Sequence, residues 1–255
     1  MNSKLSTQVL LDLIEHRRFG ASYEPIVSLA DGAPVGYEAL ARFYDGHGAP
    51  ISPQLVFDSL HASPLTLFQV EYAMKRLQLA HAPAGGLRLF VNLDPDAFQA
   101  GVHHAGHPLV ALLSGRPGLV VEIIENSDIN DADIGEAMAA AFAAAGLELA
   151  LDDIGAPRTM LSLPILLTVN FLKFDRSWLG HVDDPVRCAA LRHLVAFARE
   201  SGKRTILEGI EHESQLAFAR TIGFDYVQGY LYRPRFINTG CLASEAAPQA
   251  ESVAA

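Results

Sequence analysis

Two adjacent aspartates, Asp152 and Asp153, close an apolar run in the stretch "LALDDIGAP" at 149–157. Polar residues also fall late in most of the other apolar runs of the chain, and these are Glu38, Asn92, Glu122, Lys173, Glu208, Glu211 and Gln228. If the runs are strands of one barrel, these side chains converge at a single open end. Carboxylates packed closely need positive charge between them. Mg²⁺ and Mn²⁺, which prefer oxygen ligands, would supply that charge.

Such a cluster predicts phosphoester chemistry. Adjacent aspartates at a strand exit can share two cations, and two ions about 3.5–4 Å apart stabilise both the attacking and the leaving oxygen. Each residue alone has a structural alternative, since Asp153 could cap a helix and Asn92 could shape a turn. Lys173, flanked by apolar residues in "FLKFD", is harder to explain structurally. The convergence of so many polar residues therefore favours a site.

The elements that must position these residues alternate regularly along the chain. Eight apolar, β-branched runs lie at 22–29, 34–42, 87–94, 119–125, 147–153, 169–175, 204–211 and 225–232. Helical patterns lie between most of them, at 64–81, 134–146, 185–202 and 213–223. This alternation predicts a parallel α/β sheet, and eight strands favour a closed barrel. Only "ADGA" separates the first two runs, so we expect a hairpin and an antiparallel first strand.

Composition bounds the remaining expectations. The chain has 255 residues, a formal net charge of -10 and two cysteines without metal-ligand spacing. We expect one domain over 1–242, a disordered tail over 243–255, an N-terminal amphipathic helix within 1–18 and a reducing, cytoplasmic compartment. The acidic charge argues against nucleic-acid polymers, and no run is long enough to span a membrane. We interpret the cluster of His103, His104 and His107 as a solvated loop.

Seven motifs occur in an order and spacing that resemble a known family. They are "YEPIVSLADGAPVGYEALARF", "FVNLD", "VEIIE", "LDDIG", "LKFD", "LEGIE" and "VQGYLYRP", and they span about Arg18 to Pro234. The series resembles EAL domains, the cyclic di-GMP phosphodiesterases, whose name-giving triplet is here Glu38-Ala39-Leu40. The resemblance implies an α/β fold, a modified TIM (β/α)8 barrel with an antiparallel first strand. It also implies hydrolysis of one phosphodiester bond of cyclic di-GMP, which gives linear pGpG.

The resemblance further implies a role for each matched residue. Two divalent cations, Mg²⁺ or Mn²⁺, would be held by Glu38, Asn92, Glu122, Asp152, Asp153 and Glu208, with Glu208 as a ligand or a proton acceptor. Lys173 would position the attacking water, and Glu211 would anchor the loop after the aspartates. The substrate-binding positions would be Arg42, which holds a phosphate, together with Leu40, Glu24, Asp175 and a supporting Gln228.

Two departures from the family pattern leave alternatives open. Residues 154–160 lack the second glycine and most hydroxyls that usually follow the aspartates, and Glu24 stands where the family typically has glutamine. A receptor that binds cyclic di-GMP with little turnover therefore remains an alternative, as does a hydrolase for another phosphodiester. We see no attached regulatory domain in the sequence. Regulation could therefore come from a homodimer, for example through the helix at 185–201, or from a protein partner.

Overall fold

Eight strands close a barrel in the computed structural model, which describes residues 5–101, 106–124, 129–157 and 159–241. Around the ring they are β1 (Phe19–Ser28), β2 (Pro34–Tyr44), β4 (Arg88–Asn92), β5 (Leu119–Ile124), β6 (Glu148–Ile154), β7 (Phe171–Phe174), β8 (Arg204–Leu207) and β9 (Tyr226–Val227). Two short strands extend the sheet outside the ring: β3 (Pro50–Ile51) beside β2 and β10 (Ile237–Asn238) beside β1. The predicted α/β barrel is thus confirmed.

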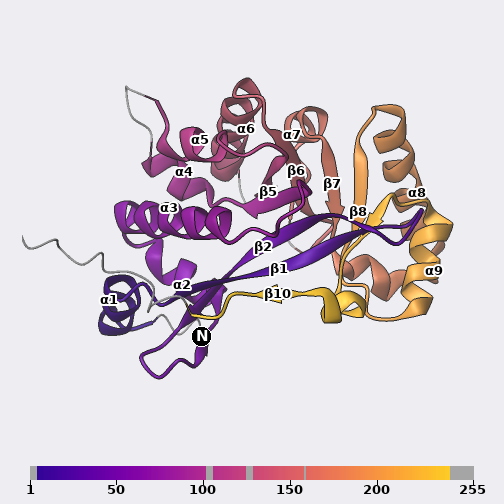
Figure 1. Ribbon diagram of the computed structural model, residues 1–255. Helices are drawn as coiled ribbons and strands as arrows, with labels where there is room; N and C mark the ends of the chain where they lie inside the picture. Colours follow the sequence, from indigo (N-terminus) through magenta and orange to yellow (C-terminus); the bar gives the residue numbers. More distant parts are fainter. Residues whose placement is uncertain (1–4, 102–105, 125–128, 158, 242–255) are drawn as a thin grey trace, which may run out of the picture.

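The first strand is antiparallel to both of its neighbours, as the short hairpin connection predicts. β1 pairs antiparallel with β2 along almost its whole length, with Glu24 opposite Glu38, and antiparallel with β9 where the ring closes. The pairings from β2 through β4 and onward to β9 are all parallel. Figure 1 shows β1 and β2 as one long ribbon crossing the molecule, with β10 beside it. The carboxyl ends of the other strands consequently open onto one mouth.

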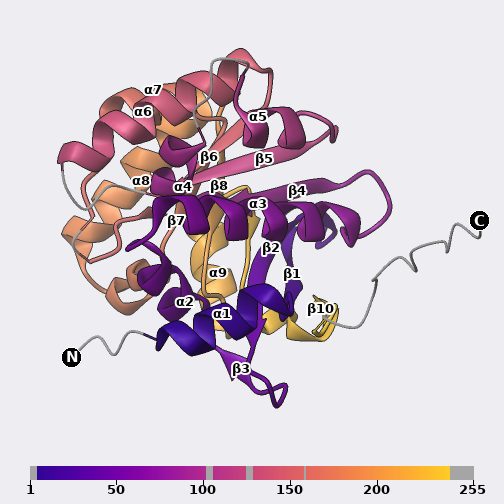
Figure 2. The same cartoon turned by 90° about the vertical axis from the view of Figure 1, so that its left-hand side faces the viewer.

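Helices surround the barrel (Figure 2). They are α1 (Thr7–Glu15), α2 (Pro53–Leu60), α3 (Pro64–Ala80), α4 (Pro95–Ala100), α5 (Pro108–Leu113), α6 (Ile129–Ala144), α7 (Leu163–Thr168), α8 (Pro185–Glu200) and α9 (Glu213–Ile222), with 3-10 turns at Arg176–His181 and Tyr230–Arg235. The expected helices appear as α1, α3, α6, α8 and α9. Periodicity missed α2, α4, α5 and α7 because each has only six to eight residues.

The short helices nonetheless carry a sequence signal at their first residues. Asp94 precedes Pro95, and its side chain accepts hydrogen bonds from the backbone of Asp96 and Ala97, so this aspartate caps α4. His107 likewise accepts from Leu109 N at the start of α5, and its ring stacks on Phe98 at 4.2 Å. The expectation of a solvated loop is therefore wrong for His107, which is a structural cap. His103 and His104 lie outside the described residues.

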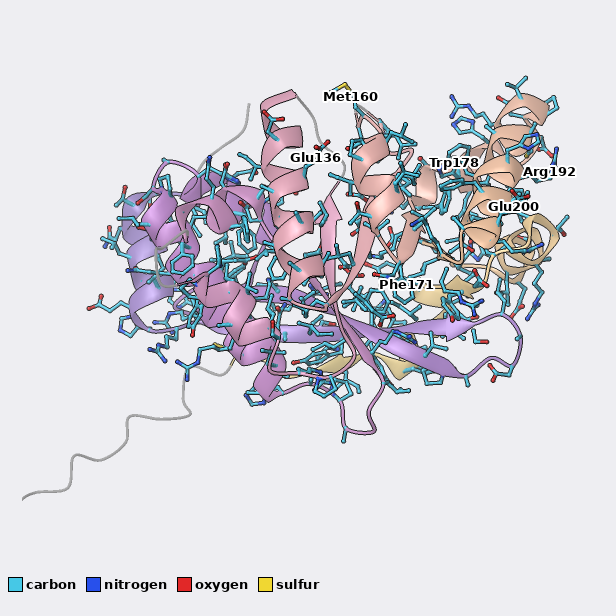
Figure 3. All side chains as sticks on the ribbon, turned by 90° about the horizontal axis from the view of Figure 1, so that it is seen from above. Glu136, Met160, Phe171, Trp178, Arg192 and Glu200 are labelled. Carbon is cyan, nitrogen blue, oxygen red and sulfur yellow. The ribbon has the colours of Figure 1, made fainter. Side chains whose placement is uncertain are left out.

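Three hydrophobic clusters hold the fold together. The largest lies between the strands and the outer helices, and a second packs α1, α2 and α3 against the ends of β1 and β2. The third lies inside the barrel and contains one buried residue from each of six strands: Ile26, Phe90, Val120, Ala150, Phe171 and Ile206. Phe90 and Phe171 meet there edge to face at 5.1 Å, and Figure 3 labels Phe171 in the middle of the strands.

Among the described residues, no helix combines the length and the apolar character that a membrane crossing needs. The tail expected at 243–255 falls outside the part of the chain that the structure describes.

We predict that Phe90→Ala lowers the free energy of unfolding by about 3–5 kcal/mol, because it opens a cavity in the interior layer that supports the mouth. Phe90 is fully buried, whereas Leu11 on α1 is 59% exposed and provides the control Leu11→Ala. Chemical denaturation of both variants measures the difference. Equal losses for the two variants would contradict a closely packed interior layer.

Candidate functional site

The polar residues of the mouth form a layer directly above the apolar interior layer. On β4, β5, β6, β7 and β8 the polar residue lies two residues after an interior apolar residue, so it points to the same side of its strand. The pairs are Phe90 with Asn92, Val120 with Glu122, Ala150 with Asp152, Phe171 with Lys173, and Ile206 with Glu208. On antiparallel β1 the order reverses, and Glu24 precedes Ile26 by two. We call Glu24, Glu38, Asn92, Glu122, Asp152, Lys173, Glu208 and Gln228 the polar layer.

Glu38 on β2 is tied into this layer by two amides. Its Oε1 accepts from Asn92 Nδ2 at 2.8 Å, and its Oε2 accepts from Gln228 Nε2 at 2.6 Å. Burial alone would raise the pKa of Glu38, but nearby Lys173 and these hydrogen bonds outweigh it and hold the pKa below its usual value. Glu38 therefore enters the site as a fixed anion, and the turn role considered for Asn92 is wrong.

Lys173 lies at the centre of the carboxylates and is fully buried. Its Nζ contacts four of them, at 2.6 Å from Glu122, 2.9 Å from Glu208, 3.0 Å from Asp152 and 3.6 Å from Glu38. Burial would lower the pKa of Lys173, yet the surrounding carboxylates raise it well above its ordinary value. Lys173, which was hardest to explain from the sequence, thus supplies positive charge to the four carboxylates around it.

The two aspartates reach the mouth through an irregularity in β6. The pairing of β6 with β7 shifts register between Leu151 and Ile154, and Asp153 adopts a φ of 59°. Such a bulge interrupts the alternation that would send adjacent side chains to opposite faces. Asp152 Oδ1 accepts a hydrogen bond from Asp153 N. The next described helix, α7, begins at Leu163 and is capped by Ser162, so Asp153 does not cap a helix. Non-glycine residues seldom adopt this left-handed conformation, but aspartate is among those that tolerate it.

One ammonium does not balance the carboxylates of this layer. Burial, with the charge of Glu38, raises the pKa of Glu122 well above its usual range, and burial likewise raises those of Asp152 and Glu208. The pKa of Asp153 rises to about 7, first through burial and then through repulsion by Asp152. Without further positive charge these carboxyl groups therefore keep their protons to higher pH than they would in water.

The side chains fit divalent cations. Oxygens of Glu38, Glu122 and Asp152 lie within 4.8 Å of one another, and so do those of Asp152, Asp153 and Glu208. Asp152 belongs to both groups, as a bridging ligand would. Glu122 Oε2 is buried and has no hydrogen-bond partner among the described residues. An all-oxygen set with an orphaned carboxylate oxygen suits Mg²⁺ or Mn²⁺ better than softer metals.

Two pockets adjoin the polar layer. A cavity of about 550 Å³ is lined by Leu40, Arg42 and Asn92, and by a buried ion pair of α3, Glu71 with Lys75, which the sequence did not suggest. A smaller cavity of about 210 Å³ is lined by the remaining expected substrate-binding residues, Glu24, Asp175 and Gln228, and by Glu208 and Glu211.

Three predicted site residues, Arg42, Asp175 and Glu211, lie outside the polar layer. Arg42 pairs with Glu24 at 3.4 Å, and Asp175 accepts from Ser177 N at the start of a 3-10 turn. Glu211 keeps an exposed side chain at the rim of the smaller pocket. Its expected anchoring of the loop after the aspartates stays a prediction.

Sequence reasoning missed the residues that support the aspartate loop. Trp178 Nε1 donates to Ile154 O at 2.8 Å, and Ser177 Oγ donates to Gly155 O at 3.1 Å. Gly155 has a φ of 84°, and a Cβ there would meet the indole of Trp178 at 2.4 Å. The loop therefore packs directly on Trp178, which lies in the turn between β7 and α8 (Figure 3). The only tryptophan of the chain was the available signal.

Comparison with known proteins agrees with this geometry. A family model described as "EAL domain" matches residues 7–235. The chain is 28% identical over 228 residues to the probable cyclic di-GMP phosphodiesterase PdeB of Escherichia coli (strain K12), covering 88% of this chain and 44% of PdeB. It is 26% identical to the bifunctional diguanylate cyclase/cyclic di-GMP phosphodiesterase MucR of Pseudomonas aeruginosa, covering 90% of this chain and 35% of MucR. The chain thus spans less than half of these relatives.

Solved structures share the architecture. The structure named "PaMucR Phosphodiesterase, c-di-GMP complex" matches with a TM-score of 0.64 and 25% identity, covering 88% of this chain and 96% of that one. The Bacillus subtilis YkuI protein, solved with c-di-GMP and calcium, matches with a TM-score of 0.71 and 24% identity, covering 87% of this chain and 56% of that one. The second likeness shows the fold alone.

We predict that Trp178→Phe weakens Mn²⁺ binding about tenfold, because phenylalanine keeps the ring but loses the N–H that holds the aspartate loop. The unfolding free energy in a chelator should fall by only about 1 kcal/mol, since Ile154 O keeps a second donor, Asp175 N. Titration calorimetry and denaturation measure the two effects separately.

Tyr226→Phe is the control, since it removes a hydroxyl from an aromatic residue packed against the interior layer below. An unchanged Mn²⁺ affinity in Trp178→Phe would contradict the supporting role of the indole.

Proposed function

The chain belongs to the EAL domain family, and on this premise we propose that it hydrolyses cyclic di-GMP to linear pGpG with the help of two divalent cations, Mg²⁺ or Mn²⁺. The observation that carries the proposal is the polar layer itself. Every acidic residue expected as a ligand lies at one mouth, around a fully buried lysine. A domain that only binds its ligand has no evident need for so costly a concentration of buried charge.

Each group would have a distinct task. Glu38, Asn92, Glu122, Asp152, Asp153 and Glu208 would hold the cations, which when bound would supply positive charge to the phosphate and activate a water for attack. Lys173 would orient that water and share in neutralising the carboxylates. Glu208 belongs to the polar layer and also lines the smaller pocket, so it is suited to accept a proton there.

Binding would use the two pockets beside the layer. Arg42 would hold one phosphate, with Leu40 beneath it in the larger pocket, while Asp175 and Gln228 would face the ligand from the smaller pocket. A cyclic dinucleotide has two similar halves, and a mouth with two adjoining pockets suits that shape. The names of PdeB and MucR support this substrate class.

We predict that the purified protein with Mn²⁺ or Mg²⁺ converts cyclic di-GMP to pGpG, and that Glu38→Gln lowers the rate about 100-fold or more. The substitution keeps the shape of the side chain but removes a buried anion from the cation-binding set, and even supporting partners of ligands typically contribute 10–100-fold. Chromatographic separation of substrate and product gives the rates.

The control is Glu200→Gln, which changes the same group on the exposed face of α8 (Figure 3). Turnover that survives Glu38→Gln unchanged would refute the assigned chemistry. Tight binding with no product, even with Mn²⁺, would instead identify a receptor.

A further inference from the structure

Glu24 and Arg42 contact each other between the linings of the two pockets. Glu24 Oε1 lies 3.4 Å from Arg42 Nη2, and their side chains are 12% and 33% exposed. Glu24 belongs to the lining of the smaller pocket and Arg42 to that of the larger one. A ligand that fills both pockets would therefore contact both members of the pair.

The hairpin register explains how the two side chains meet. Arg42 lies opposite Gly20, and Glu24 lies opposite Glu38, so the contact runs diagonally along the hairpin. Both side chains point to the same side of the hairpin as inward-facing Glu38. Arg42 follows Glu38 by four residues on β2, and Glu24 lies directly opposite Glu38 on β1. The other terminal nitrogen of Arg42, Nη1, donates to Ala41 O at 3.0 Å. The guanidinium is thus already engaged on two sides.

The surroundings of Glu24 make its charge unfavourable for an anionic ligand. The smaller pocket also contains Asp175, Glu208 and Glu211, against a single cationic side chain, Arg176. Glu24 faces Glu38 across the hairpin as well. A phosphate that binds Arg42 must displace the carboxylate of Glu24, and the part of the ligand that enters the smaller pocket meets like charge.

We propose that Glu24 is a specificity-determining residue that restrains binding: it occupies Arg42 in the free protein and so weakens the capture of a phosphodiester anion. The inference rests on the proposed function, since it assigns Arg42 to the phosphate. Glu24 acts through Arg42 as a positioning residue and does not take part in the chemical step. Replacing it should therefore strengthen binding, whereas removal of a ligand-binding group would weaken it.

The test compares wild type with Glu24→Gln and Glu24→Ala. Calorimetric titration with cyclic di-GMP in the presence of Ca²⁺ should show that the dissociation constant falls in both variants, by a factor of up to about five. With Mn²⁺, the KM should fall by a similar factor while kcat stays within about twofold of wild type. Asp31→Asn removes the same charge from the exposed turn of the same hairpin, and it should leave both constants unchanged.

The outcomes separate the inference from the proposed function. If wild type binds cyclic di-GMP but both variants bind it equally or more weakly, Glu24 contacts the ligand favourably and the inference is overturned. An equal gain in Asp31→Asn would show a general effect of net charge and would also overturn it. If wild type and variants all fail to bind, the proposed function fails together with the inference. Thermal unfolding of each variant confirms that the comparison is between folded proteins.

Discussion

The repulsion among carboxylates buried at one mouth of the barrel is the constraint on which the rest of the site depends. Burial raises the free energy of each ionised group, and closeness raises it further. Lys173 offsets part of this cost through contacts with four carboxylates, but it carries only one charge. Burial first, and then repulsion by neighbouring carboxylates, raises the pKa values of Glu122, Asp152, Asp153 and Glu208. A site built in this way has a strong electrostatic preference for added cations.

The barrel makes this concentration of charge tolerable by separating two layers. The apolar layer below packs large side chains such as Phe90 and Phe171, which hold the strands in fixed register. The polar layer follows two residues further along each parallel strand, so the same register that packs the interior also aims the ligands. The exception is β6, where a register shift and the left-handed Asp153 present two successive carboxylates. Ser177 and Trp178, in the 3-10 turn after β7, donate hydrogen bonds to the backbone carbonyls just after Asp153 and so hold this segment in place.

Much of this arrangement could be predicted from the sequence, for identifiable reasons. Polar residues late in apolar runs indicated the layer, and the four-residue link before Pro34 indicated the antiparallel β1. What the sequence could not give were contacts between distant segments, such as the clamp of Trp178 on Gly155 or the ion pair of Glu24 with Arg42. Short helices such as α4 and α5 escaped because they complete less than two turns of periodicity. His107, which caps α5, was accordingly interpreted as part of a solvated loop.

We infer that the polar layer is a binding site for divalent cations and not a self-sufficient network of ion pairs. Anomalous diffraction at the manganese edge, from crystals grown with Mn²⁺, tests it most directly. We expect anomalous peaks among the oxygens of Glu38, Glu122, Asp152 and Glu208, with Asp152 shared between two ions. No anomalous peak in the layer, with Lys173 still in contact with all four carboxylates at saturating Mn²⁺, would contradict it.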